Sequence, residues 1–189
     1  MMKNMVIIAM ALVLPITLAL GQDIQFGAKA GINLATIQPD LNDPATRTSF
    51  HLGGMVEISV SDKFSVQPEL LYSSQGATDE SDDDEVIKLD YISLPILAKY
   101  FVVENLSLEA GPQLGYVVSA EVEDDGDTID LKDDTKSTDI GFALGAGYKL
   151  ENGLNFGLRY FFGSDVNDID EDADQFKNRV FQLSIGYFF

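Results

Sequence analysis

The chain has 189 residues, 31 of them acidic and 12 basic, and its formal net charge is -19. Such a negative chain repels the phosphates of nucleic acids, so we expect no nucleic-acid partner. The absence of cysteine excludes disulfides and thiolate metal sites, and a single histidine, His51, argues against histidine-based metal or catalytic centres, so we expect no metal site and no cofactor.

The first residues have the features of a secretory signal peptide. Lys3 supplies a positive charge, residues 5–20 are apolar, and Ala19 and Gly21 are small residues at the two positions that a signal peptidase requires. We predict cleavage before Gln22, which leaves residues 22–189 as one mature domain. The alternative is a permanent transmembrane helix, but the run of about 16 residues is shorter than the roughly 20 that a span requires.

The mature chain alternates apolar with polar or small residues, which is typical of strands with one apolar face. In the last stretch Phe181, Leu183, Ile185, Tyr187 and Phe189 share one parity, and only Phe188 breaks the pattern. An apolar strand at a free chain end would promote aggregation in a soluble protein. We predict eight strands, at residues 24–35, 50–60, 64–74, 88–101, 106–118, 138–150, 154–163 and 178–189.

The connections between these strands alternate between long and short. Long loops at residues 36–49, 75–87, 119–137 and 164–177 would lie on one rim, and three short turns, one of them containing Asn152-Gly153, on the other. Short periplasmic turns, long external loops and an even strand number are the pattern of outer-membrane barrels. We therefore predict an all-β, eight-stranded, antiparallel up-and-down transmembrane β-barrel, integral to the outer membrane of a Gram-negative cell and in contact with its lipid.

Three details refine this prediction. Six tyrosines fall on the outward parity, as expected for aromatic girdles at the membrane interfaces: Tyr72, Tyr100, Tyr116, Tyr148, Tyr160 and Tyr187. Pro68 lies inside a strand, where it donates no hydrogen bond, and indicates a bulge or local distortion. Asp90 has the outward parity of the apolar residues, so it must lie above the membrane or beyond a bulge.

Charged residues well inside the strands all fall on the inward parity. A charge on the lipid face costs about 2–4 kcal/mol at the bilayer midplane, so this parity is expected. Three are basic and three acidic, and we predict that they form an ion-paired belt across the lumen, with Lys29 beside Glu57 and with Glu69, Lys99 and Glu109 on successive strands. The six are Lys29, Glu57, Glu69, Lys99, Glu109 and Arg159.

Other chemistry is weakly indicated. Glu69 and Glu109 could form a general acid and base pair, but a structural ion-pair network explains them better, and we expect no enzyme activity. His51 faces inward near the long-loop rim and is expected to be a rim residue.

The last three long loops hold six, eight and six acids. Asp124-Asp125-Gly126-Asp127 and the acidic run at residues 165–174 resemble calcium-loop material without EF-hand spacing, so these loops either bind divalent cations or form a solvated acidic rim.

Several segments resemble a family of outer-membrane β-barrels common in Bacteroidetes, described as porin-family or PorT-like. The matching segments are at residues 27–33, 67–73, 89–95 and 110–115. The resemblance implies an eight-stranded barrel that is exported and inserted by the barrel-assembly machinery. It also implies that Phe189, together with Tyr187 and Ile185, belongs to the signal which that machinery recognises. We take Phe181 and Leu183 as the rest of this assembly signal.

These observations favour a structural or surface-interaction role for a small barrel with a filled lumen. A narrow transport or secretion-associated component is the first alternative, because family members are described as porins. A soluble lipocalin-like carrier is the second, although lipocalins direct their apolar face inward. Conductance across a lipid bilayer separates the first two, and partition into detergent tests the third.

Overall fold

A computed structural model of the chain describes residues 23–38, 44–79, 86–124, 127–132, 137–165 and 177–189. The predicted signal peptide and most of the acidic run at residues 165–174 lie outside these ranges. Within them no helix is long and apolar enough to cross a membrane. The eight long strands are β1 (Ile24–Gln38), β3 (Arg47–Ser61), β4 (Phe64–Asp79), β5 (Val86–Val103), β6 (Leu106–Asp124), β8 (Thr138–Lys149), β9 (Leu154–Asp165) and β10 (Lys177–Phe188).

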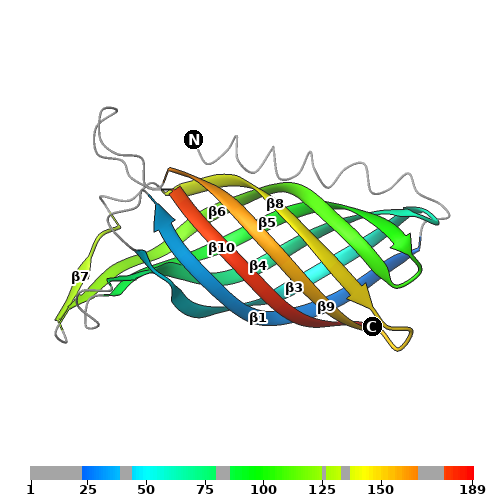
Figure 1. Cartoon of the computed structure of the whole chain (residues 1–189), viewed down its shortest axis with the longest axis horizontal. Coiled ribbons are helices and arrows are strands. Elements are labelled where there is room, and N and C mark those ends of the chain that lie inside the picture. Colours follow the sequence, from blue (N-terminus) through cyan, green and yellow to red (C-terminus); the bar gives the residue numbers. More distant parts are fainter. Residues whose placement is uncertain (1–22, 39–43, 80–85, 125–126, 133–136, 166–176) are drawn as a thin grey trace.

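These strands form one closed antiparallel barrel (Figure 1). Each long strand pairs with the next along the chain, and β1 closes the ring by pairing with β10 from Gly27↔Phe188 to Gln38↔Lys177. Two short strands, β2 (Pro44–Ala45) and β7 (Asp127–Asp130), extend the sheet beside β4 and β6. The structure confirms the predicted eight-stranded up-and-down barrel, in which ring closure leaves the long strands paired on both sides.

The three short turns lie at one end, together with the C-terminus, and β7 lies at the other end (Figure 1). The β8–β9 turn matches its sequence signal. Gly153 adopts a φ of +88° and donates from its N–H to the carbonyl of Leu150 over 3.0 Å. The Leu154 N–H donates to Oδ1 of Asn152 over 3.1 Å. A three-residue loop that ends in a left-handed glycine is a common hairpin connection.

The strands reach further into the long loops than the sequence predicts. β4 continues to Asp79, β5 starts at Val86 and β6 continues to Asp124, so parts of the predicted loops at residues 75–87 and 119–137 are strand. The predicted strands end where acidic residues interrupt the apolar alternation. Above the membrane, neighbouring strands need only backbone hydrogen bonds to pair and do not need an apolar face. An exposed Lys88–Glu123 ion pair links β5 to β6 in this region.

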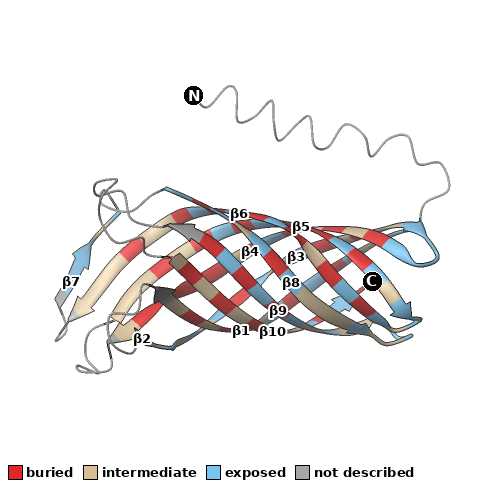
Figure 2. Ribbon diagram, turned by 45° about the horizontal axis from the view of Figure 1, so that its top comes forward, coloured by how far each residue is buried: buried red, intermediate tan, exposed pale blue. Residues whose placement is uncertain are grey.

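The two faces of the barrel differ as the alternation predicts. Figure 2 shows buried and exposed residues alternating along the strands. Phe156 and Leu183 are 44% and 42% exposed on the outside, whereas Lys99 and Arg159 are each 4% exposed inside. The predicted tyrosines share the outer face, while Tyr91, on the opposite parity, is buried in the lumen. The apolar face therefore points to lipid and the charged face to the axis.

Pro68 and Asp90 disturb the sheet locally. The β3–β4 register is the same on both sides of Pro68, and only the paired residues around it are interrupted, so the distortion contains no bulge. At Asp90 the β5–β6 register shifts, as expected for a bulge. Asp90 lies on the outer side and accepts a hydrogen bond of 2.7 Å from the Tyr72 hydroxyl, which gives the outward carboxylate a partner.

Candidate functional site

The six predicted belt residues all lie buried inside the barrel, on six different long strands. Each is on the inward parity of its strand, and glycines across the wall give several of them space. A Cβ on Gly147, for example, would lie 2.5 Å from Oε1 of Glu109, and one on Gly145 would lie 3.4 Å from Cβ of Arg159. Small residues at these positions therefore make a charged layer possible in a narrow lumen.

Arg159 on β9 is the centre of this layer. Its two terminal nitrogens donate to both carboxylate oxygens of Glu69 on β4 over 2.8 and 2.9 Å. The same guanidinium lies 3.4 Å from Oε2 of Glu109 on β6. Lys29 on β1 reaches Glu69 from the other side over 3.4 Å. A bidentate arginine–carboxylate pair is strong and fixes geometry, so Arg159 orients both acids.

Lys99 on β5 continues the network toward the short turns. Its Nζ lies 2.6 Å from Oε2 of Glu57, 3.6 Å from Oε1 of Glu109 and 2.9 Å from Oε1 of Gln67. Lys149 on β8 binds the other oxygen of Glu57 over 2.8 Å. One chain of ion pairs thus runs from Lys149 to Lys29. We name these seven residues the ion-pair belt: Lys29, Glu57, Glu69, Lys99, Glu109, Lys149 and Arg159.

Two details of the predicted belt need correction. Lys29 does not pair with Glu57: it lies opposite Gly53 in the β1–β3 ladder, while Glu57 lies opposite Gln25. Lys29 instead extends across β3 to Glu69 on β4. Lys149 is a further member that was not predicted, because it stands at a strand end; its inward parity is the signal that indicates it.

Above the belt, toward the long loops, the lumen is filled by mostly neutral side chains. Asn33 is the centre of a hydrogen-bond cluster: its Nδ2 donates to the carbonyls of Phe50 and Ser74, and its Oδ1 binds His51 Nδ1 over 2.8 Å and Gln182 over 3.0 Å. His51 is therefore a buried lumen residue and not the predicted rim residue, because β3 extends beyond it to Arg47.

Apolar side chains complete the filling of this upper part. One buried cluster brings together five residues around Phe161, and a second gathers around Tyr91 near the long loops. The first consists of Ala35, Leu97, Ala143, Phe161 and Val180, and the second of Leu89, Tyr91, Val117 and Ala120. The first cluster draws on five strands around the ring and so crosses the axis above the ion-pair belt, whereas the second lies on the adjacent strands β5 and β6 and lines one side of the lumen.

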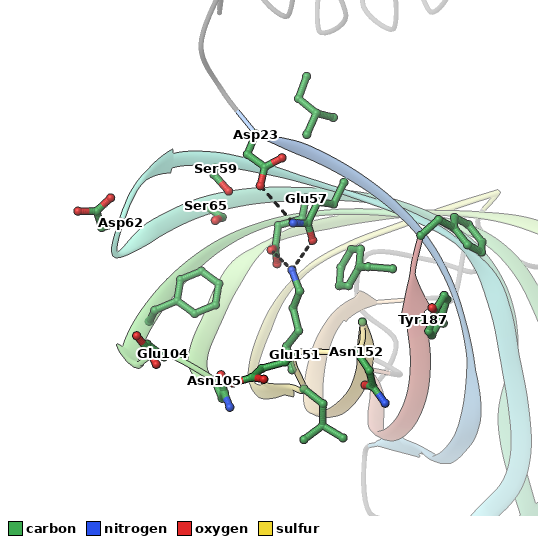
Figure 3. A pocket seen from close by; sticks show the side chains of 18 of the residues that line it. Asp23, Glu57, Ser59, Asp62, Ser65, Glu104, Asn105, Glu151, Asn152 and Tyr187 are labelled. Atoms are coloured by element: carbon green, nitrogen blue, oxygen red, sulfur yellow. Dashed lines mark hydrogen bonds and ion pairs between the residues drawn. The ribbon is translucent and has the colours of Figure 1, made fainter.

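At the short-turn rim the lumen opens into a cavity of about 960 Å³, which we name the vestibule (Figure 3). Its floor is made by Glu57, Lys149 and the inward ring of Phe188, and Lys149 Nζ lies 4.4 Å from the centre of that ring. Phe188, the exception to the alternation of the last strand, thus covers the lower side of the ion-pair belt. Acidic residues of the short turns line the entrance.

The chemistry available in the lumen is limited by these contacts. Glu69 and Glu109, considered above as an acid and base pair, both accept hydrogen bonds from Arg159. Among the described residues, no group of three or more histidine, aspartate or glutamate side chains is arranged to hold a metal ion. Most of the acidic loop segments predicted to bind divalent cations lie outside the described ranges.

The predicted assembly signal occupies the outer face of β10 and the chain end. Leu183, Ile185, Tyr187 and Phe189 are exposed and Phe181 is half-buried. The Phe189 N–H donates to the carbonyl of Phe26 over 2.9 Å, which ties the terminus to β1. Recognition of these residues by the assembly machinery remains a prediction.

Comparison with known proteins agrees with this architecture. A sequence model of the outer membrane protein beta-barrel domain matches residues 20–171. No curated protein sequence matches the chain significantly. Neisserial surface protein A (NspA) has a similar crystal structure, with a TM-score of 0.59 at 13% identity over 87% of this chain and 97% of that one.

Ail, the attachment invasion locus protein of Yersinia pestis, is also similar, with a TM-score of 0.53 at 15% identity over 87% of this chain and 98% of that one. A second Ail structure, in complex with the heparin analogue sucrose octasulfate, matches with a TM-score of 0.54 at 16% identity, over 88% of this chain and 99% of Ail. At these identities the likeness shows a shared fold.

Proposed function

The chain belongs to the outer membrane protein β-barrel family and is an integral outer-membrane protein, and on this premise we propose that it is a closed barrel with a structural or surface-interaction role. The observation that carries the proposal is the filled lumen. An unbroken set of ion pairs crosses it near the short turns, and the apolar cluster around Phe161 crosses it above. A solute on the axis would have to displace paired, buried charges, which costs several kcal/mol per ion.

Planar-bilayer recording tests this proposal. We expect the purified, refolded barrel to give no stable single-channel current at moderate voltage, while a general porin in the same membrane conducts. Insertion is checked independently by heat-modifiable migration on a gel. A reproducible current from inserted protein would contradict the closed lumen and favour the alternative of a narrow transport or secretion-associated component, which the finer resemblance to PorT-like porins of Bacteroidetes suggests.

A soluble lipocalin-like carrier does not fit this chain. A lipocalin directs apolar side chains inward around its ligand, whereas here Leu158, Leu183 and Ile185 are exposed on the outside and the axis is charged. The outer-membrane location excludes the soluble reading as well. We also propose that the buried carboxylates stabilise the barrel and do not catalyse a reaction, since Arg159 engages both Glu69 and Glu109.

The surface role is expected to involve positively charged partners. The last three long loops hold most of the acids of the chain, and the described part of the long-loop end includes Glu121, Glu123 and Asp130. Ail has been solved with a sulfated heparin analogue, but an acidic rim would repel such a polyanion. We therefore propose divalent cations or basic segments as partners of these loops.

Binding of the refolded barrel to immobilised heparin and to a basic resin, with and without Mg²⁺, distinguishes these partners. We expect retention on the basic resin that falls with salt, and no retention on heparin without a divalent cation. Tight heparin binding in a chelator would overturn the proposed partner class while leaving the closed-lumen proposal intact.

A further inference from the structure

The vestibule ends on an ammonium group that is already bound. Lys149 Nζ lies 2.5 Å from Oε1 of Gln25 and 2.8 Å from Oε1 of Glu57, and it lies 4.4 Å from the centre of the Phe188 ring. A carboxylate, an amide oxygen and an aromatic face are the groups that stabilise an alkyl ammonium. The floor of the vestibule is therefore a built ammonium site with a side chain of the protein in it (Figure 3).

This site lies at the boundary between the sealed lumen and the open cavity. Glu57 is 3% exposed and its second carboxylate oxygen binds Lys99 behind it. The side chain of Lys149, in contrast, is 21% exposed and lines the vestibule. Glu57 is thus held from inside by Lys99, and Gln25 is held at the entrance, where its Nε2 donates to Oδ2 of Asp23 over 3.2 Å. The ammonium that occupies the site is reached from the short-turn side.

The rest of the vestibule suits a second positive charge. Carboxylates from all three short turns line it, namely Asp62, Glu104 and Glu151, and none of them forms an ion pair with another described residue. Phe101 and Leu150 add apolar wall between the floor and the entrance. A volume of about 960 Å³ is ample for a small ligand. The cavity thus combines a defined ammonium site, an apolar wall and free carboxylates.

We propose that the vestibule binds a linear alkyl diammonium ion from the periplasmic side. One ammonium of the ligand takes the place of Lys149 against Glu57, Gln25 and Phe188, and the other lies among the turn carboxylates. The exchange replaces one ammonium by another, so the charge beside Glu57 is conserved and its pair with Lys99 is kept. The released Lys149 turns toward the carboxylates at the entrance.

Calorimetric titration of 1,4-diaminobutane into the refolded barrel, at fixed ionic strength, tests this proposal. Lys149→Ala removes the internal competitor, whose effective concentration is in the millimolar range, so we expect the variant to bind about tenfold more tightly than the parent. Lys63→Ala is the matched control. Lys63 is an exposed lysine of a short turn, so its loss changes the net charge equally and leaves the site occupied.

Equal affinities of Lys149→Ala and Lys63→Ala would overturn the proposal, because the diamine would then respond to net charge alone or bind at the acidic long loops. A second measurement keeps the test independent of Glu57, whose variants risk misfolding. Adding Gln25→Leu to Lys149→Ala removes one acceptor, and we expect most of the gain to be lost. Replacing Glu104 and Glu151 by glutamine should abolish the preference for 1,4-diaminobutane over propylammonium, and an unchanged preference would contradict the placement of the second ammonium.

Discussion

The two halves of the lumen are equally buried but are built differently. The half near the short turns holds the ion-pair belt, where each acid contacts at least two cations. The half near the long loops holds mostly amides, hydroxyls and apolar groups, with Asp139 as a buried acid that Asn178 contacts over 3.2 Å. Among the described residues, Ser93 Oγ, Gln113 Oε1 and the Tyr91 hydroxyl of this second half have no hydrogen-bond partner, and in the charged half Arg159 Nε has none.

The difference follows from the free energy of burial. An unpaired buried ion costs several kcal/mol, so a charged layer is stable only when every member has a partner. An unpaired neutral polar group costs about 1–3 kcal/mol, which a barrel can tolerate at a few positions. The comparison therefore predicts that substitutions in the charged half lower the free energy of unfolding strongly. In the neutral half, the loss of unfolding free energy depends on the number of hydrogen bonds removed.

The largest effect is expected for Glu69→Gln. This change keeps the shape but leaves Arg159 and Lys29 without their main partner, and breaking a buried pair in this way costs about 3–5 kcal/mol. Urea unfolding of the barrel in lipid vesicles, followed by the heat-modifiable gel shift, measures the loss. Glu104→Gln at an exposed turn is the control and should change the unfolding free energy by less than about 0.5 kcal/mol. Similar midpoints for both variants would refute the role of the charged half.

Asn33→Leu tests the best-connected residue of the neutral half. It removes donors to two carbonyls and the acceptor of His51 and Gln182, and we expect a loss of about 2–3 kcal/mol from the unsatisfied groups. The same unfolding assay applies, with Asn105→Leu as the matched substitution, because the side chain of this short-turn asparagine forms no hydrogen bond with another described residue. A loss as large as that of Glu69→Gln would erase the distinction between the halves.

Arg159→Lys separates charge from geometry within the belt. The lysine retains the positive charge but lacks the planar fork that binds both oxygens of Glu69. We expect a loss of about 1–2 kcal/mol, smaller than for Glu69→Gln, because one charge-assisted hydrogen bond is removed and the ion pair remains. If Arg159→Lys is as unstable as Glu69→Gln, bidentate geometry and not charge balance governs this half.

Ser93→Ala should have the smallest effect. The hydroxyl is buried and has no hydrogen-bond partner among the residues that the structure describes, so its removal eliminates an unsatisfied polar group. We expect stability to change by less than about 1 kcal/mol, in the stabilising direction. Ser73→Ala is the control, because Ser73 accepts hydrogen bonds from Asn33 and Gln75 and its loss should be unfavourable. A clear destabilisation by Ser93→Ala would show that this hydroxyl has a partner after all.

The barrel and the parity of its charges follow from the sequence because both depend on alternation alone. Partners within the lumen do not, since they depend on register and strand tilt: Lys29 reaches Glu69 past Gly53 instead of pairing with Glu57. The side chains that fill the neutral half are also hard to predict from the sequence. Phe161 points inward beside the outward Phe162, and no apolar–polar alternation distinguishes such neighbours.

The ion-pair belt also bears on how the barrel forms. Glu69 on β4 binds Lys29 on β1 and Arg159 on β9, and Lys149 on β8 binds Glu57 on β3. None of these strand pairs is adjacent in the sheet. A partly assembled, open sheet therefore cannot bring Arg159 to Glu69 or Lys149 to Glu57 and still exposes these charges to water, although Lys99 and Glu109 can already meet across the β5–β6 ladder. The belt is complete only in the closed ring, so closure and burial of these charges are coupled, and the closed barrel resists opening one strand at a time.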